Sequence, residues 1–68
     1  MTSEIKIWKN VKEYRNKLGL SQEDFAKKSG VKYTTLTKIE SNVIKKPSVF
    51  IMAKLAKILG VSIEDLIK

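Results

Sequence analysis

The sequence contains no cysteine and no histidine. No disulfide can therefore crosslink the chain, and the Cys/His clusters that hold structural zinc are excluded. A P-loop and a clustered pair of carboxylates are missing as well, so we expect no catalytic residues, no metal and no cofactor. The lack of cysteine fits a reducing cytoplasm, where we expect the protein to act.

Long hydrophobic runs are also missing. The longest extends from Val49 to Ala53, whereas a membrane-spanning helix needs about 20 apolar residues. The opening residues, MTSEIKIWKN, lack the continuous apolar stretch of a secretory signal. We therefore expect neither a membrane span nor a signal peptide.

Basic residues, in contrast, are plentiful. The chain has 68 residues, which we assign to one domain over residues 1–68, and 14 basic against 7 acidic side chains give a net charge of +7. Such a balance favours an acidic partner, with nucleic acid ahead of an anionic membrane. The alternative is a lysine-rich surface whose only role is to stay well solvated.

Four stretches have clear helical patterns. Ile7, Val11, Tyr14 and Leu18 recur at the spacing of one helix face, and Gly19 ends that helix. Two similar segments, LSQEDF and VSIEDL, each place a serine N-cap three residues before an aspartate, which predicts helices at about 22–29 and after residue 62. A fourth helix is expected from about residue 48 to residue 59, after a loop over residues 41–47.

The stretch from residue 32 to residue 40, KYTTLTKIE, is ambiguous. Its threonines favour a strand, but strand alternation leaves neither face apolar. As a helix it places Leu36 and Ile39 on one side, and burying them at about 1.5–3 kcal/mol each outweighs about 0.5 kcal/mol of propensity per threonine. We therefore predict a helix. Its outer face of short hydroxyls suits contact with base edges, although a merely polar face is the simpler interpretation.

Taken together, these segments resemble the Cro/repressor (XRE-type) helix-turn-helix family. The resemblance runs through LSQEDFAKKSGVKYTTLTKIE, KKPS and LAKILGVSIEDL and covers about residues 11–67. It implies an all-α fold of five helices like that of lambda repressor, with the helix-turn-helix over about residues 21–40. It also implies a cytoplasmic, nucleoid-associated protein of a bacterium or phage.

The resemblance assigns roles to individual positions. In such proteins the helix at 32–40 enters the major groove, with Tyr33, Thr34 and Lys38 at the base-reading positions and Thr37 beside them. The positions that usually contact phosphates are Gln22, Lys32, Ser41, Asn42 and Lys45.

Arg15 and Glu40 match a pair that often forms an ion pair beneath the DNA-facing surface in this family. Arg15 is the only arginine of the chain, and a planar, bidentate contact is one that lysine makes poorly. We therefore predict an ion pair between them; two unrelated surface charges are the alternative.

Two departures from the family pattern concern binding surfaces. Lys32 stands where an N-cap serine or threonine is usual, and lysine cannot cap. The helix at 48–59 is apolar on nearly all sides. We hypothesise that Phe50, Ile51, Ile63 and Ile67 contribute to self-association, with an enlarged monomer core as the alternative interpretation.

The function that these observations imply is sequence-specific binding of double-stranded DNA by a transcriptional regulator, most simply a repressor that binds a palindromic operator as a dimer. An antitoxin, which would also bind a toxin, and a protein-interaction module are the alternatives. Enzymatic activity and membrane binding are disfavoured.

Overall fold

Five helices make up this structure, a computed structural model that describes residues 6–68. They are α1 (Ile7–Lys17), α2 (Gln22–Ser29), α3 (Tyr33–Glu40), α4 (Val49–Leu59) and α5 (Ile63–Ile67). The described residues contain no strand, so the all-α prediction is confirmed. None of the five helices has the length and apolar character needed to cross a membrane. The signal-peptide prediction rests partly on residues 1–5, which lie outside the described residues.

Serines begin three of the helices. Ser21, Ser48 and Ser62 each accept a hydrogen bond from the backbone N–H three residues later. Of these three serines, only Ser62 belongs to a complete capping box, because its own N–H also donates to Asp65 Oδ2 at 3.1 Å. This bond, with the serine hydroxyl and Lys68, holds the pKa of Asp65 below its ordinary value of 3.8. At α2, among the described residues, only the serine half of the predicted capping box is present.

A left-handed residue follows four of the helices. Gly19 (φ 70°), Gly30 (φ 76°) and Gly60 (φ 71°) have this conformation after α1, α2 and α4, as glycine allows without strain. After α3 the same role belongs to Asn42, with φ 66°. Its N–H donates to the Ile39 carbonyl at 3.1 Å, and the next N–H, of Val43, donates to the Lys38 carbonyl at 2.9 Å. This pair of bonds is a Schellman motif, which satisfies carbonyls left over at a helix end.

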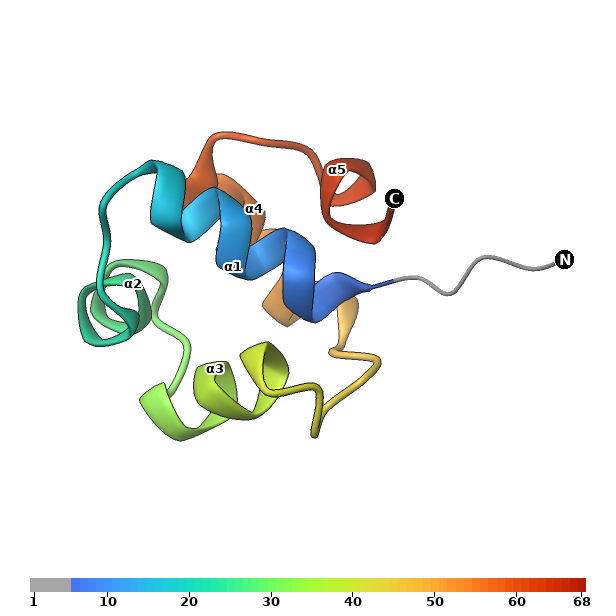
Figure 1. Ribbon diagram of the computed structural model, residues 1–68, viewed down its shortest axis with the longest axis horizontal. Helices are drawn as coiled ribbons and strands as arrows, with labels where there is room; N and C mark the ends of the chain where they lie inside the picture. The colour runs from blue at the N-terminus through green and yellow to red at the C-terminus, as the bar shows by residue number, and fades with distance from the viewer. Residues whose placement is uncertain (1–5) are drawn as a thin grey trace, which may run out of the picture.

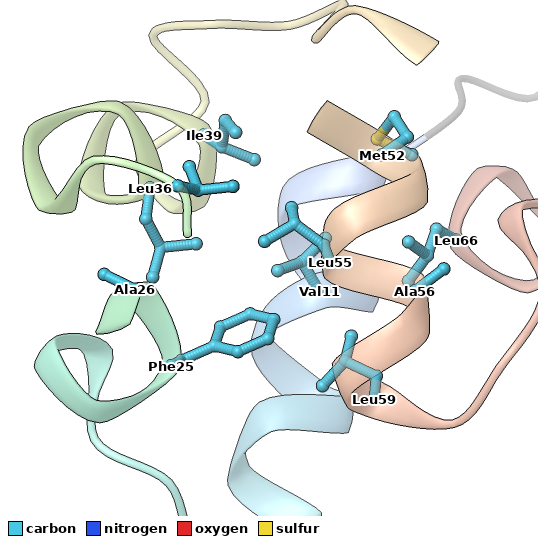
Figure 2. Close-up of a cluster of buried hydrophobic side chains, with 11 residues drawn as sticks. Val11, Phe25, Ala26, Leu36, Ile39, Met52, Leu55, Ala56, Leu59 and Leu66 are labelled. Carbon is cyan, nitrogen blue, oxygen red and sulfur yellow. The ribbon is translucent and has the colours of Figure 1, made fainter. Parts of the chain in front are cut away.

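The core is shared by all five helices. In Figure 1, α2 and α3 lie on one side of α1, and α5 lies on the other side near the C-terminus. α1 contacts α3, α4 and α5, while α2 packs on α3 and α4. Figure 2 shows their apolar side chains converging; the fully buried ones are Val11, Phe25, Leu36, Ile39, Leu55 and Leu66.

The inner face of α3 behaves as predicted. Leu36 and Ile39 are completely buried, and burial of this kind stabilises by more than the threonines of the helix cost. Packing with the other helices therefore overrides the strand preference of this stretch. The same burial fixes the rotation of α3 about its axis and so decides which residues face outwards.

The prediction for Leu18 is wrong. We expect it on the inner face of the first helix, but its side chain is 51% exposed. α1 ends at Lys17, and Leu18 is its C-cap, where the chain turns towards the left-handed Gly19. Leu18 keeps right-handed helical angles (φ −85°, ψ −4°), so the period still describes its direction. The period does not show where the packing against a helix stops, and Leu18 lies at the end of α1.

Candidate nucleic-acid interface

Four polar side chains on α3 form the centre of the candidate interface. Because Leu36 and Ile39 face the core, Tyr33, Thr34 and Lys38 are exposed, and Thr37 is half-buried beside them. The structure thus brings all four predicted base readers onto one helix. Thr34, Thr37 and Lys38 lie within about one turn of this helix, so their side chains can reach adjacent groups on a ligand.

Two hydroxyls near this face are already hydrogen-bonded. Thr37 Oγ1 donates to the Thr34 carbonyl at 2.9 Å, and Ser41 Oγ donates to the Lys38 carbonyl at 3.3 Å. A carbonyl can only accept, so each hydroxyl uses its single proton within the helix. To donate to a phosphate, Ser41 must first release this long bond.

Arg15 and Glu40 form a bidentate ion pair beneath α3. Arg15 Nε lies 2.8 Å from Glu40 Oε2, and Nη2 lies 3.0 Å from Oε1. Arg15 Nη1 also donates to the Leu20 carbonyl at 2.6 Å. The two residues are only 9% and 6% exposed. This pair ties α1 and the turn after it to the end of α3.

Gln22 joins the same network. Its Nε2 donates to Glu40 Oε1 at 3.0 Å, so the first residue of α2 is linked to the last residue of α3. An amide nitrogen carries two protons. One of them is donated to Glu40, and the other makes no hydrogen bond within the described residues. No sequence pattern connects residues 22 and 40; only the packing of the helices brings them together.

The turn between α2 and α3 is stabilised by a residue that the sequence patterns do not single out. Ser29 is buried; its hydroxyl donates to the Ala26 carbonyl and accepts from the Val31 N–H, each at 3.3 Å. With the left-handed Gly30 it makes up the turn that joins the two helices. The available signal was its spacing from Phe25 and Ala26, which places Ser29 on the inner face of α2.

A protein-family model matches the same part of the chain. This family model, described as helix-turn-helix, covers residues 11–66. The chain belongs to the helix-turn-helix family, of the Cro/repressor type. The segment predicted to be its helix-turn-helix contains α2, the turn at Gly30 and α3.

Several relatives of this helix-turn-helix protein are named as regulators. The HTH-type transcriptional regulator SinR of Bacillus subtilis is 34% identical over 61 residues, which cover 90% of this chain and 55% of SinR. The chain thus spans about half the length of SinR. An uncharacterised HTH-type transcriptional regulator of Methanocaldococcus jannaschii is 45% identical over 56 residues, or 82% of this chain and 83% of that protein.

Solved structures of SinR share the fold. The crystal structure of SinR in complex with DNA superposes with a TM-score of 0.89 at 34% identity and covers 91% of this chain and 98% of that one. A structure of SinR with the protein SinI matches with the same TM-score and covers 91% of this chain and 60% of that one.

The predicted phosphate-contacting residues of the helix-turn-helix surround α3. Lys32 is exposed at its N-cap and makes no capping bond with its side chain. Ser41 and the partly buried Asn42 follow its last turn, and Lys45 is exposed in the loop beyond. Together with Gln22 they occupy both ends of the helix.

The residues predicted for self-association fall into two groups. Phe50 is 77% exposed and Ile67 is 40% exposed. Ile51 and Ile63 are instead half-buried and pack against the core, as the alternative interpretation expects. Val43 and Val49 are also exposed. The sequence contained a signal for including Val49 in this set, because it lies beside Phe50 in the first turn of an apolar helix.

Proposed function

We propose that the protein is a transcriptional repressor that binds double-stranded DNA sequence-specifically, with α3 in the major groove. The observation that carries this proposal is the rotation of α3. Burial of Leu36 and Ile39 turns short polar side chains outwards on a rigid helix, which is how a recognition helix meets base edges. Similarity to SinR, whose structure is solved with DNA, supports the same function.

Contacts with phosphates would position this helix. Lys32 and Lys45 supply charge on either side of α3, and Gln22 has one amide proton available at the N-terminus of α2, where the helix dipole favours anions. Ser41 and Asn42 complete the proposed set. The net charge of +7 favours association with DNA, which in a bacterium or phage-infected cell means the nucleoid in the cytoplasm.

We further propose that two copies bind a palindromic operator. Like charges oppose association of the free protein, whereas DNA neutralises them. The exposed Phe50 and Ile67 offer apolar surface for a contact between copies. Every relative named above is described as a transcriptional regulator, so the proposal is a binding function and not a catalytic one.

Selection of duplexes from a random pool, followed by affinity measurements at several salt concentrations, tests this proposal. We expect an enriched site with two related half-sites. About 5 phosphate contacts per protomer should make log K fall with log salt at a slope of about −4.5, since each contact contributes about −0.9. A flat salt dependence with no enriched site would refute DNA binding.

Binding of a protein partner is the second candidate, either as an antitoxin or as an interaction module. The exposed apolar residues at the start of α4, Val49 and Phe50, favour it. SinR has been solved with SinI, which shows that a relative of this fold contacts a protein. Co-expression with the product of an adjacent gene tests this candidate: a stable complex lost in Phe50→Ser supports it, and separate elution of the two proteins opposes it.

A further inference from the structure

The hydroxyl of Thr37 has a fixed direction. Thr37 lies in the middle of α3, and its Oγ1 is 2.9 Å from the carbonyl oxygen of Thr34, one turn earlier. A carbonyl oxygen has no proton to give, so the hydroxyl must be the donor. Threonine in a helix commonly makes this bond to a preceding carbonyl. Its only proton is therefore directed at the helix and away from any ligand.

This direction limits what Thr37 can recognise. Its oxygen still has lone pairs, so towards a ligand it is an acceptor only. It can form no hydrogen bond with phosphate oxygens, with guanine N7 and O6, or with thymine O4, because all of these are acceptors too. The donors that bases present in the major groove are the exocyclic amino groups of adenine (N6) and cytosine (N4).

We propose that Thr37 is a specificity-determining residue that accepts a hydrogen bond from the amino group of an adenine or cytosine in each half-site. The inference rests on the proposed DNA-binding function and deepens it. Its signature is one operator position at which adenine and cytosine are accepted on the contacted strand and guanine and thymine are disfavoured.

The neighbours of Thr37 do not share this restriction. Lys38 has only donors and suits guanine. The Thr34 hydroxyl makes no hydrogen bond within the part of the chain that the structure describes, so it can donate or accept. A preference for amino groups therefore distinguishes Thr37 from the side chains beside it.

Two substitutions separate the hydroxyl from the methyl group. Thr37→Val keeps the shape and removes the lone pairs. Thr37→Ser keeps the hydroxyl and its bond to the Thr34 carbonyl but removes the methyl. Thr35→Val is the matched control, because Thr35 is half-buried on the flank of the same helix and the change in helix propensity is the same.

The experiment selects duplexes from a random pool with the full chain and these three variants, then measures affinities at one salt concentration. In Thr37→Val we expect the adenine/cytosine preference to vanish at one position, with about a 5- to 10-fold weaker affinity for the preferred site. Thr37→Ser and Thr35→Val should keep that preference. Thermal unfolding of each variant checks that the fold is intact.

A base analogue then tests the contact itself. At the mapped position, adenine is replaced by purine, or cytosine by pyrimidin-2-one, each of which lacks the amino group. Wild type should lose the same 5- to 10-fold, and Thr37→Val should lose nothing more.

Three results would overturn the inference. They are an unchanged preference in Thr37→Val, a thymine preference that disappears only in Thr37→Ser, and equal loss on the analogue in both proteins. Failure of the proposed function looks different: wild type itself would then enrich no sequence.

Discussion

At the scale of single residues, Arg15 has a role that follows from its own chemistry. Its guanidinium makes two bonds to Glu40 and a third to the Leu20 carbonyl. Lysine has a single nitrogen and cannot reproduce this planar arrangement. The lone arginine was therefore a usable sequence signal for the pair. The additional bond from Gln22 to Glu40 had no such signal.

Replacing Arg15 tests how much the network stabilises the fold. We expect Arg15→Lys to lower the free energy of unfolding by about 3 kcal/mol, because it leaves the buried Glu40 carboxylate incompletely paired. Urea unfolding followed by circular dichroism measures this. The control is Lys12→Ala, an exposed position in the same helix, which should change stability by less than about 0.5 kcal/mol. A loss no larger than that of the control would contradict the prediction.

Asn42 has a backbone role in addition to its proposed phosphate contact. Its positive φ costs an ordinary residue about 1–2 kcal/mol. We expect Asn42→Ala to destabilise the protein by about 1 kcal/mol and Asn42→Gly to leave its stability unchanged or raised, because glycine adopts this conformation freely. Urea unfolding of both variants is the measurement.

The same two variants test the contact with DNA. If Asn42 also binds phosphate, Asn42→Gly should weaken DNA binding even though its stability is intact. Equal destabilisation by alanine and glycine would show that the asparagine side chain, not the backbone angle, matters for folding.

At the scale of elements, helix ends follow local rules and helix surfaces do not. Serines three residues before their N–H partners, and glycines in left-handed positions, place most of the boundaries correctly because their hydrogen bonds lie within one turn. The helical period alone did not predict the exposure of Leu18, because a period does not show where the packing against the end of a helix stops. α3 is the element in which local preference and packing disagree most, and packing prevails.

Lys32 is a position at which the sequence departs from the local rule for the start of a helix. It is the N-cap of α3 and makes no side-chain cap. We expect Lys32→Ser to raise the free energy of unfolding by about 0.5–1 kcal/mol, since serine can accept from the N–H groups of the first turn. If Lys32 contacts a phosphate, the same change should weaken DNA binding and reduce the salt slope by about 0.9. Unfolding and anisotropy titrations measure both effects; an unchanged slope would remove Lys32 from the interface.

At the scale of the whole molecule, a small shared core coexists with a basic exterior that retains some apolar residues. Phe50 and Ile51 are neighbours in α4, yet Phe50 is exposed while Ile51 packs against the core. This difference suggests separate roles, with Phe50 available to a second copy on DNA and Ile51 needed for folding.

These adjacent residues provide a matched pair of variants. We expect Phe50→Ser to leave the free energy of unfolding within about 0.5 kcal/mol of wild type and to abolish cooperative binding to a duplex with two half-sites. Ile51→Ser should lower stability by more than about 1 kcal/mol, because it removes partly buried apolar surface. Sedimentation on one- and two-site duplexes, together with urea unfolding, measures these effects. Cooperativity that survives Phe50→Ser would point instead to Ile67, the second exposed member of the set predicted for self-association.

The sequence by itself determined the helices, the serine N-caps of three of them, the turn at Gly30 and, through the period of Leu36 and Ile39, the helical nature of α3, because these depend on interactions within three or four residues or on a simple period. It also pointed to Arg15 and Glu40 through residue types and family resemblance. Only the tertiary structure decided that Gln22 joins their network and that Phe50 is exposed while Ile51 is not. These features depend on how the helices rotate and pack against one another, and that arrangement is determined jointly by all the core side chains.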